Sequence, residues 1–284
     1  MTSFSALLHR SRPWAAVLVV GVAVLAVLGF VSAGSAAPGK HAKHPHAVPP
    51  PPAAPTNANQ IQNLDQVETA IKAYYGDTPT NTPDPVNGKT TLHVPSPTGA
   101  YAKQMHRIEH RAEGYLARHD QQAKQRKKAI VLDIDDTTLN TYNYEIYSNF
   151  VYDPTTNADF VNAAAFPAVF GMPKLVHTAR SDGYRLFFIT GRPSSQTAGT
   201  VKNLRKVGYP KVPANHLFLK DLSDPWLSSC SPNCTTTQYK SLTRKHIESR
   251  GFHITANFGD QFSDLRGGFA ARRFKIPNPM YFLP

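Results

Sequence analysis

An apolar tetrapeptide, Ala129–Leu132, runs directly into residues 133–138, which read Asp-Ile-Asp-Asp-Thr-Thr. A short, wholly apolar run is typical of a strand buried on both faces of a parallel sheet. Carboxylates crowded at the end of such a strand repel one another and resist desolvation, and a divalent cation or a reacting phosphate is the usual reason to tolerate them. Ligands of open α/β sheets bind at the carboxyl ends of the strands. The feature therefore predicts an α/β fold with a ligand site beginning at Asp133, and a solvated acidic turn is the alternative.

Three further motifs follow the first one in order. A predicted strand over residues 184–189 leads into Thr190-Gly191-Arg192, and Lys240 lies at the start of a predicted helix. A third strand, over residues 253–258, leads into a segment that carries Asp260 and Asp264. The complete set resembles the four signatures of the haloacid dehalogenase (HAD) superfamily of phosphatases. A short apolar run at residues 217–219 adds another predicted strand.

Two segments refine this resemblance. Residues 259–265 (Gly-Asp-Gln-Phe-Ser-Asp-Leu) and 274–281 (Phe-Lys-Ile-Pro-Asn-Pro-Met-Tyr) are similar to the secreted acid phosphatases of the superfamily, class B or subfamily IIIB, in the branch shared with plant vegetative storage proteins. The resemblance covers roughly residues 100–284. It implies a HAD-like (Rossmannoid) three-layer α/β fold with a central parallel sheet and a small cap insertion after the first motif.

The resemblance also implies roles for the motif residues. Asp133 would attack the phosphorus and form an aspartyl-phosphate, which splits hydrolysis into two steps. Asp135 would protonate the leaving oxygen and then activate water. The phosphate oxygens would be held by Thr190, the Gly191 amide and Lys240.

A magnesium ion is the implied cofactor, because Mg²⁺ prefers oxygen ligands and commonly bridges to a substrate phosphate. Its ligands would be the Asp133 carboxylate, the Asp135 main-chain carbonyl and Asp260. Asp264 would support the metal site or hold Lys240. No other cofactor is implied.

Several positions have a second interpretation. Lys220, which ends the strand at 217–219, is a rival to Lys240 for the phosphate. Arg192 could grip the phosphate or face solvent. Asp136 is expected to have a structural role, and Thr137 to cap the turn through a local hydrogen bond to the backbone. Plant storage proteins of this branch often lack the nucleophile, and the presence of Asp133 favours an active enzyme.

The amino-terminal region predicts export. Residues 1–37 carry basic residues, then an apolar run over 14–31, then Ser-Ala-Ala before Pro38, which is the layout of a signal peptide. The apolar run is also long enough for an uncleaved membrane anchor. No cysteine lies nearby, which excludes a lipoprotein anchor. Residues 38–56 are rich in Pro, Ala and His and predict a disordered linker, whose histidines could be solvated or bind a metal.

The chain has two cysteines, Cys230 and Cys234, in a polar loop. In an exported protein they favour a local disulfide; a metal site or a redox pair is the alternative, although zinc would need two more ligands and the spacing differs from Cys-x-x-Cys. The formal net charge is +12. Such a surface would attract anionic substrates or an anionic envelope. No nucleic-acid-binding module is recognisable, so we expect a secreted or cell-envelope protein with membrane contact only through an uncleaved anchor.

Residues 57–128 predict a helical extension that packs on the catalytic domain at 129–284. Apolar spacing predicts a helix over 57–75 that stops at Gly76, followed by a Pro-rich connection over 77–95. Ser96 then looks like a helix N-cap before Pro97. One face of this next helix is apolar and is expected to pack on the core; it comprises Tyr101, Met105, Ile108, Ala112 and Tyr115.

An aromatic insert at about 140–172 is the predicted cap. Its rings could stack on a nucleoside or aryl leaving group, or simply pack the insert. The resulting hypothesis is a secreted Mg²⁺-dependent acid phosphatase acting on phosphate monoesters, with nucleotides and aryl phosphates both open. The alternatives are a non-catalytic storage or surface protein on the same fold, and a nucleotidase or phosphotransferase of the same superfamily. The oligomeric state is left open.

Overall fold

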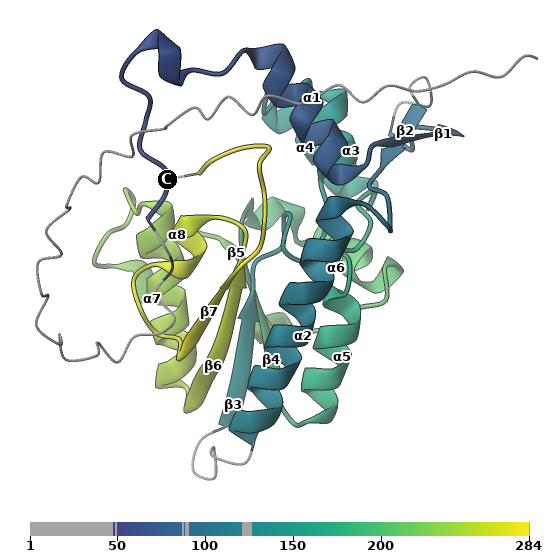
Figure 1. Cartoon of the computed structure of the whole chain (residues 1–284). Coiled ribbons are helices and arrows are strands. Elements are labelled where there is room, and N and C mark those ends of the chain that lie inside the picture. The colour runs from purple at the N-terminus through teal and green to yellow at the C-terminus, as the bar shows by residue number, and fades with distance from the viewer. Residues whose placement is uncertain (1–47, 49, 87, 89–90, 121–126, 284) are drawn as a thin grey trace, which may run out of the picture. The chain divides into compact units, whose positions relative to one another are not determined.

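A parallel five-stranded sheet lies at the centre of the chain (Figure 1). The computed structural model describes residues 48, 50–86, 88, 91–120 and 127–283. The strand order is β5-β4-β3-β6-β7, and every neighbouring pair is parallel. The strands span Lys127–Leu132 (β3), Arg185–Pro193 (β4), Leu217–Lys220 (β5), Phe252–Gly259 (β6) and Arg272–Lys275 (β7). The predicted α/β fold with a central parallel sheet is confirmed.

Helices cover both faces of the sheet and create two core clusters (Figure 1). The larger cluster receives side chains from α2, α5 and α6, and the smaller one receives them from α7. These helices and the short α8 span Ala100–Asp120 (α2), Met172–Ser181 (α5), Thr197–Lys206 (α6), Thr236–Ser249 (α7) and Phe262–Leu265 (α8). Single 3-10 turns span Ala58–Gln60 (η1), Ser194–Gln196 (η2), Ala214–His216 (η3) and Pro225–Leu227 (η4). Successive side chains of β3 enter the two clusters alternately, as expected for a strand buried on both faces.

A bulge in β6 aligns the strand ends that carry the acids. Ala129 pairs with Ile254, whereas Ile130 pairs with Ala256, so Thr255 is an extra residue in β6. The bulge moves the side chains that follow it to the opposite face, and Ile254 and Ala256 accordingly lie in different core clusters. After the bulge the register is maintained up to the pair Leu132 and Phe258. Strands β3 and β6 therefore end side by side.

The amino-terminal extension differs from its prediction in two places. Helix α1 spans Leu64–Tyr75 and ends at Gly76 as expected, but it begins seven residues later than predicted. Its predicted start does not pack on the core: Ile61 is 63% exposed and Leu64 is 69% exposed. The predicted Pro-rich connection contains an antiparallel hairpin, with β1 at Thr78–Pro83 and β2 at Thr91–Val94. A two-stranded ribbon consists only of edge strands, where proline is tolerated.

Helix α2 is the long amphipathic helix that the sequence predicts, with a later start. The prediction of Ser96 as its N-cap is wrong, because the helix begins at Ala100. Ser96 instead forms a turn, in which its carbonyl accepts from the Gly99 amide at 3.2 Å. The predicted apolar face is buried as expected; it comprises Tyr101, Met105, Ile108, Ala112 and Tyr115.

The insert at 140–172 contains two short helices, α3 (Tyr142–Tyr147) and α4 (Pro154–Asn162). We call residues 140–172 the cap. Tyr142, Tyr144, Phe160 and Phe166 are buried. Phe160 packs against Tyr144 and Phe166 within the insert, whereas Tyr142 stacks on Tyr75 of α1. Tyr147 and Tyr152 in contrast face outward, with Tyr152 67% exposed. The connection between α3 and α4 contains two consecutive left-handed residues, at 149 and 150.

The predictions for residues 1–37 and for most of the linker lie outside the described residues. Residues 50–56, which belong to the predicted linker, form neither helix nor strand and are mostly exposed to solvent. Within the described ranges, none of the helices combines the length and the apolar character that crossing a membrane requires.

Candidate active site

The segment after β3 is a tight loop that fixes the direction of Asp133. The Asp133 amide donates to the Phe258 carbonyl of β6 at 3.0 Å, and the Leu139 amide donates to the Ile134 carbonyl at 2.8 Å. Asp136 has a left-handed backbone conformation, with φ at +49°. Its buried carboxylate accepts from the Thr141 amide at 3.0 Å and from the Tyr281 hydroxyl at 2.8 Å. Asp136 therefore holds the loop in shape, which is the structural role expected for it.

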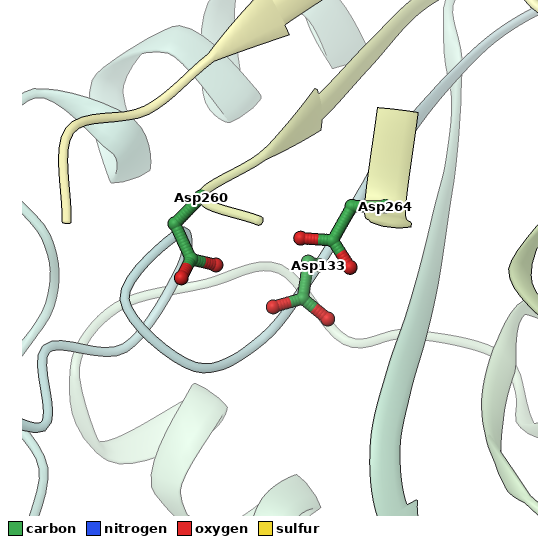
Figure 2. Close-up of side chains that lie close together, drawn as sticks. All are labelled: Asp133, Asp260 and Asp264. Atoms are coloured by element: carbon green, nitrogen blue, oxygen red, sulfur yellow. The ribbon is translucent and has the colours of Figure 1, made fainter. Parts of the chain in front are cut away.

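Three buried carboxylates converge beside this loop (Figure 2). Asp133 follows β3, Asp260 follows β6, and Asp264 lies in α8. One oxygen from each carboxylate lies within 4.8 Å of one from each of the others. We call these three residues the carboxylate cluster. All-oxygen donors of this kind suit a hard divalent cation such as Mg²⁺.

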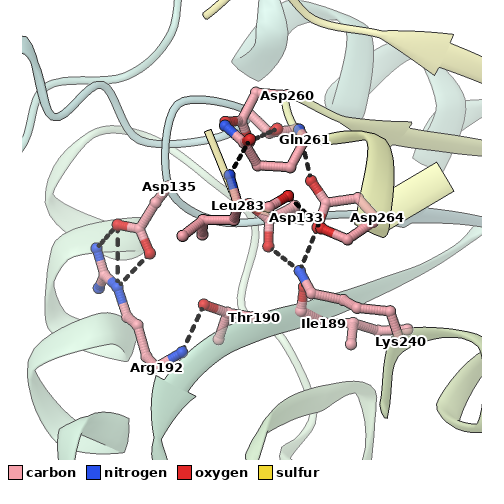
Figure 3. Close-up of polar contacts among 12 residues, drawn as sticks. Asp133, Asp135, Ile189, Thr190, Arg192, Lys240, Asp260, Gln261, Asp264 and Leu283 are labelled. Atoms are coloured by element: carbon pink, nitrogen blue, oxygen red, sulfur yellow. Dashed lines mark hydrogen bonds and ion pairs between the residues drawn. The ribbon is translucent and has the colours of Figure 1, made fainter. Parts of the chain in front are cut away.

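Lys240 lies against the carboxylate cluster (Figure 3). Its Nζ contacts Asp133, lies 2.9 Å from Asp264 Oδ1, and donates to the Ile189 carbonyl at 2.8 Å. Helix α7 delivers this lysine in its second turn and begins with a capping box between Thr235 and Gln238. Lys240, and not its rival Lys220, is therefore the lysine that contacts Asp133.

The carboxylate cluster holds more negative charge than this one lysine neutralises. Burial, followed by the charge of Asp264, raises the pKa of Asp260 to about 6. Burial also raises the pKa of Asp133 well above its usual value, with Lys240 opposing this and Asp264 adding to it. Burial lowers the pKa of Lys240, but the carboxylates of Asp133 and Asp264 outweigh it and raise that pKa overall. A divalent cation would relieve this excess of negative charge, so the residues present fit a metal.

Polar side chains fix the orientation of Asp260 and Asp264. Asp260 accepts from Thr137 Oγ1 at 3.0 Å and from Asn278 Nδ2 at 2.8 Å. The prediction that Thr137 caps the turn is therefore wrong. Its hydroxyl instead donates to Asp260, which follows β6. Gly259 is required here, because an added Cβ would lie 2.3 Å from the Cβ of Asp264.

Arg244 is a supporting residue that no sequence motif indicated. It is almost completely buried, and its guanidinium donates to the carbonyls of Asp264, Arg266 and Gly268. These bonds fix the loop after α8 and with it the position of Asp264. Burial lowers the pKa of Arg244 to about 10. The sequence could have indicated Arg244 by its position four residues after Lys240, because this spacing places both side chains on the same face of α7.

Asp135 points away from the carboxylate cluster and pairs with Arg192 (Figure 3). Arg192 Nε donates to Asp135 Oδ2 at 3.0 Å, and Nη2 donates to Oδ1 at 2.6 Å. Its Nη1 donates to Thr200 Oγ1 at 2.9 Å. Arg192 is buried, so the interpretation that it faces solvent is wrong. The Asp135 side chain is 28% exposed, which makes it the most accessible acid of the motifs, and we call the surface around it the opening.

Thr190 and Gly191 lie at the carboxyl end of β4, as predicted. Thr190 is fully buried, and its Oγ1 accepts from the Arg192 amide at 3.2 Å. An added Cβ at Gly191 would meet no heavy atom within 4 Å, so space is open beside this residue. The structure thus brings the predicted site residues to one edge of the sheet, in two groups. One group surrounds Lys240 and the other lies at the opening.

The two cysteines form the predicted disulfide, Cys230–Cys234. It closes the loop between η4 and Thr235, the N-cap of α7. Thr235 lies five residues before Lys240. Cys234 is buried in the smaller core cluster, and Cys230 packs against it. The bond therefore anchors the start of the helix that carries Lys240.

A groove of about 440 Å³ lies between α1, α2 and the segment 277–279. Its lining includes Tyr74, Ile71 and Asn278 but none of the acids of the four motifs. Because phosphoryl chemistry requires charge neutralisation at the phosphate, the edge of the sheet, and not this groove, is the candidate site.

The comparisons with known proteins agree with this geometry. The family model described as HAD superfamily, subfamily IIIB (acid phosphatase) matches residues 80–284. The chain is 33% identical over 167 residues to a stem 28 kDa glycoprotein of Glycine max, covering 55% of this chain and 61% of the relative. It is 32% identical over 157 residues to acid phosphatase 1 of Solanum lycopersicum, covering 54% and 58%. It is also 30% identical over 166 residues to vegetative storage protein 1 of Arabidopsis thaliana, covering 54% and 55%. The match thus spans little more than half the length of these relatives.

A solved structure supports the fold. The class C acid phosphatase from Bacillus anthracis superimposes with a TM-score of 0.55 at 24% identity, covering 65% of this chain and 80% of the other. Because the family model matches well over half of the chain, from the amino-terminal hairpin to the end, the assignment does not depend on any single relative. The chain belongs to the acid phosphatase family of the HAD superfamily, subfamily IIIB.

Proposed function

We propose that this chain is a secreted, Mg²⁺-dependent acid phosphatase that hydrolyses phosphate monoesters through an aspartyl-phosphate on Asp133. The observation that carries the proposal is the buried contact of Asp133 with Lys240 beside two further carboxylates. A phosphate dianion repels an incoming nucleophile, so orientation and charge neutralisation are most of the catalytic task. The names of the relatives, which include an acid phosphatase, add support.

In this mechanism each group has a defined task. Asp133 Oδ attacks phosphorus while the leaving oxygen takes a proton from Asp135, which Arg192 orients. Thr190 and the Gly191 amide hold the phosphate oxygens, and Lys240 neutralises charge beside the nucleophile. Asp135 then removes a proton from the water that attacks the aspartyl-phosphate.

Magnesium would be held by the Asp133 carboxylate, the Asp135 main-chain carbonyl and Asp260, with Asp264 supporting the site and holding Lys240. When bound, it would supply positive charge to the phosphate oxygens. The fit rests on the buried excess of carboxylates described above. A test is calorimetric titration of EDTA-treated protein with Mg²⁺, for which Asp260→Asn is expected to weaken binding by at least about 10-fold.

The domain arrangement is part of the proposal. We propose a signal peptide at 1–37, a linker at 38–56, an amino-terminal extension at 57–128 and a catalytic domain at 129–284 whose cap lies at 140–172. The Cys230–Cys234 disulfide is compatible with export, because such bonds persist in oxidising compartments.

The decisive experiment is phosphate release by wild type and by Asp133→Asn, in which an isosteric amide replaces the nucleophile. We expect the variant to lose at least about 10³-fold in kcat because it cannot form the covalent intermediate. Asp159→Asn, an exposed change in α4, is the matched control and should keep full turnover. Unchanged turnover in Asp133→Asn would refute the mechanism.

A storage protein is the second candidate, favoured by the similarity to vegetative storage proteins. It predicts that folded, Mg²⁺-loaded wild-type protein releases no phosphate from any aryl, alkyl or nucleotide ester between pH 4 and 8. Turnover of any of these esters that depends on Asp133 would exclude it.

A further inference from the structure

Glu145 is a buried acid that the proposed mechanism does not use. It lies in α3 and is 6% exposed. Among the described residues its carboxylate has no hydrogen-bond or ion-pair partner, whereas Asp135 pairs with Arg192. The oxygens of Glu145 are not among the fully buried side-chain atoms that lack a partner, so they still reach the solvent. The carboxylate is therefore available to a bound substrate.

The position of Glu145 points to the opening. Its backbone amide donates to the carbonyl of Thr141, one helical turn earlier, and Thr141 donates to Asp136 through both its amide and its hydroxyl. Residues four apart lie on the same face of a helix, so Glu145 lies on the face that meets the loop of the first motif. Burial raises the pKa of Glu145 to about 8, and the charges of Asp136 and Asp135 add to the effect. Without a cation beside it, Glu145 therefore keeps its proton below that pH.

An exposed aromatic ring belongs to the same segment as Glu145. Tyr152 is 67% exposed, so its ring is available to a ligand. The connection that carries Tyr152 is tied to α3 at two points. The Phe150 amide donates to the Glu145 carbonyl at 2.8 Å, and the Asp153 amide donates to Tyr144 Oη at 2.9 Å. Glu145 and Tyr152 are thus parts of one short, fixed segment.

We propose that Glu145 binds an ammonium group on the leaving alcohol, so that the preferred substrates are phosphate monoesters of amino alcohols. The inference rests on the proposed phosphatase function, because it places the leaving group at Asp135. A buried carboxylate that lacks a partner ionises at neutral pH only when a positive charge accompanies it, and an ammonium group is such a charge. Aromatic faces also attract ammonium groups, which gives Tyr152 a matching role. A neutral aryl or alkyl group would leave Glu145 without a partner.

The test uses two ligands of similar size that cannot be hydrolysed, 2-aminoethylphosphonate and propylphosphonate. Their affinities for the Mg²⁺-loaded protein are measured by calorimetry at pH 8. We expect wild type to bind the ammonium compound about 10-fold more tightly, because hydrogen bonds between charged groups are the strong ones. Glu145→Gln should bring the ratio of the two affinities close to one. Asp159→Asn, which removes an exposed charge from the cap, should leave the ratio unchanged.

Each outcome decides the inference. The inference is supported if wild type prefers the ammonium compound and Glu145→Gln does not. It is overturned if wild type shows no preference, if the preference survives in Glu145→Gln, or if neither compound binds. Turnover of an aryl phosphate by the same preparations tests the phosphatase function separately. Turnover without a Glu145-dependent preference would overturn only this inference, and selective binding without turnover would overturn only the proposed function.

Discussion

The carboxylate cluster and the cap side of the opening are both acidic and both buried, but their acids differ in whether they have partners. In the carboxylate cluster, Asp133 and Asp264 contact Lys240, and Asp260 accepts hydrogen bonds from Thr137 and Asn278. On the cap side, Glu145 has no partner within the described chain. The difference separates two tasks. Partnered acids hold a fixed geometry for the chemistry, which is the same for every ester, whereas an acid without a partner is available to the variable part of a substrate.

The largest effect is expected on breaking the partnered side, with Lys240→Met. The change leaves Asp133 and Asp264 buried without their cation, and loss of one partner of a buried pair costs about 3 to 5 kcal/mol. Denaturant unfolding of the metal-free protein measures this loss. Lys245→Met, an exposed change on the same helix, should alter the free energy of unfolding by less than about 0.5 kcal/mol.

Repeating the unfolding experiment with Mg²⁺ tests whether the metal and Lys240 share the same carboxylates. Because a bound cation would replace part of the lost positive charge, Mg²⁺ should stabilise Lys240→Met more than it stabilises wild type. Equal stabilisation of the two proteins would contradict a metal site that shares its carboxylates with Lys240.

The two sides also differ in how far the sequence predicted them. Acids at the ends of Ala129–Leu132 and of the strand at 253–258 had to meet, because parallel strands end at one edge of a sheet. The bulge at Thr255 that keeps these ends level leaves no mark in the pattern of apolar residues. Arg192 was correctly placed after β4, but its partner depends on the side-chain rotamer, which spacing along the chain does not determine.

The cap was less predictable for a physical reason. Glu145 lies between tyrosines in a six-residue helix, which is too short for a hydrophobic period to reveal which face is buried. Likewise, the hairpin at 78–94 was missed because β1 contains two prolines and is largely exposed, and β2 is only four residues long. The sequence thus predicts the positions that the sheet controls. It does not predict those that depend on packing between short segments.

An effect of opposite sign, no larger than that of Lys240→Met, is expected for Glu145→Gln. The pKa of Glu145 is raised from 4.5 to about 8, so between these values the folded protein holds a proton that the unfolded chain has lost. Stability due to this group therefore falls as pH rises from about 4.5 to 8. We expect the metal-free variant to be more stable than wild type by about 4 kcal/mol at pH 8 and equal to it near pH 4.5. Thermal unfolding across this range measures it; a difference that does not change with pH would mean that Glu145 is already ionised and satisfied.

The smallest effect concerns Arg192, which orients Asp135 at the opening. Arg192→Lys keeps the charge but loses the two-point contact, because an ammonium group is not a planar fork. If Asp135 donates the proton to the leaving oxygen, kcat should fall about 10-fold for an alkyl phosphate and less for p-nitrophenyl phosphate, whose leaving group needs less protonation. Thr200→Val removes only the hydroxyl that accepts from Arg192 Nη1, and it should produce the same pattern at smaller size, with the larger loss for the alkyl phosphate. An equal loss for both esters in Arg192→Lys would mean that Arg192 acts on the phosphate, and not through Asp135.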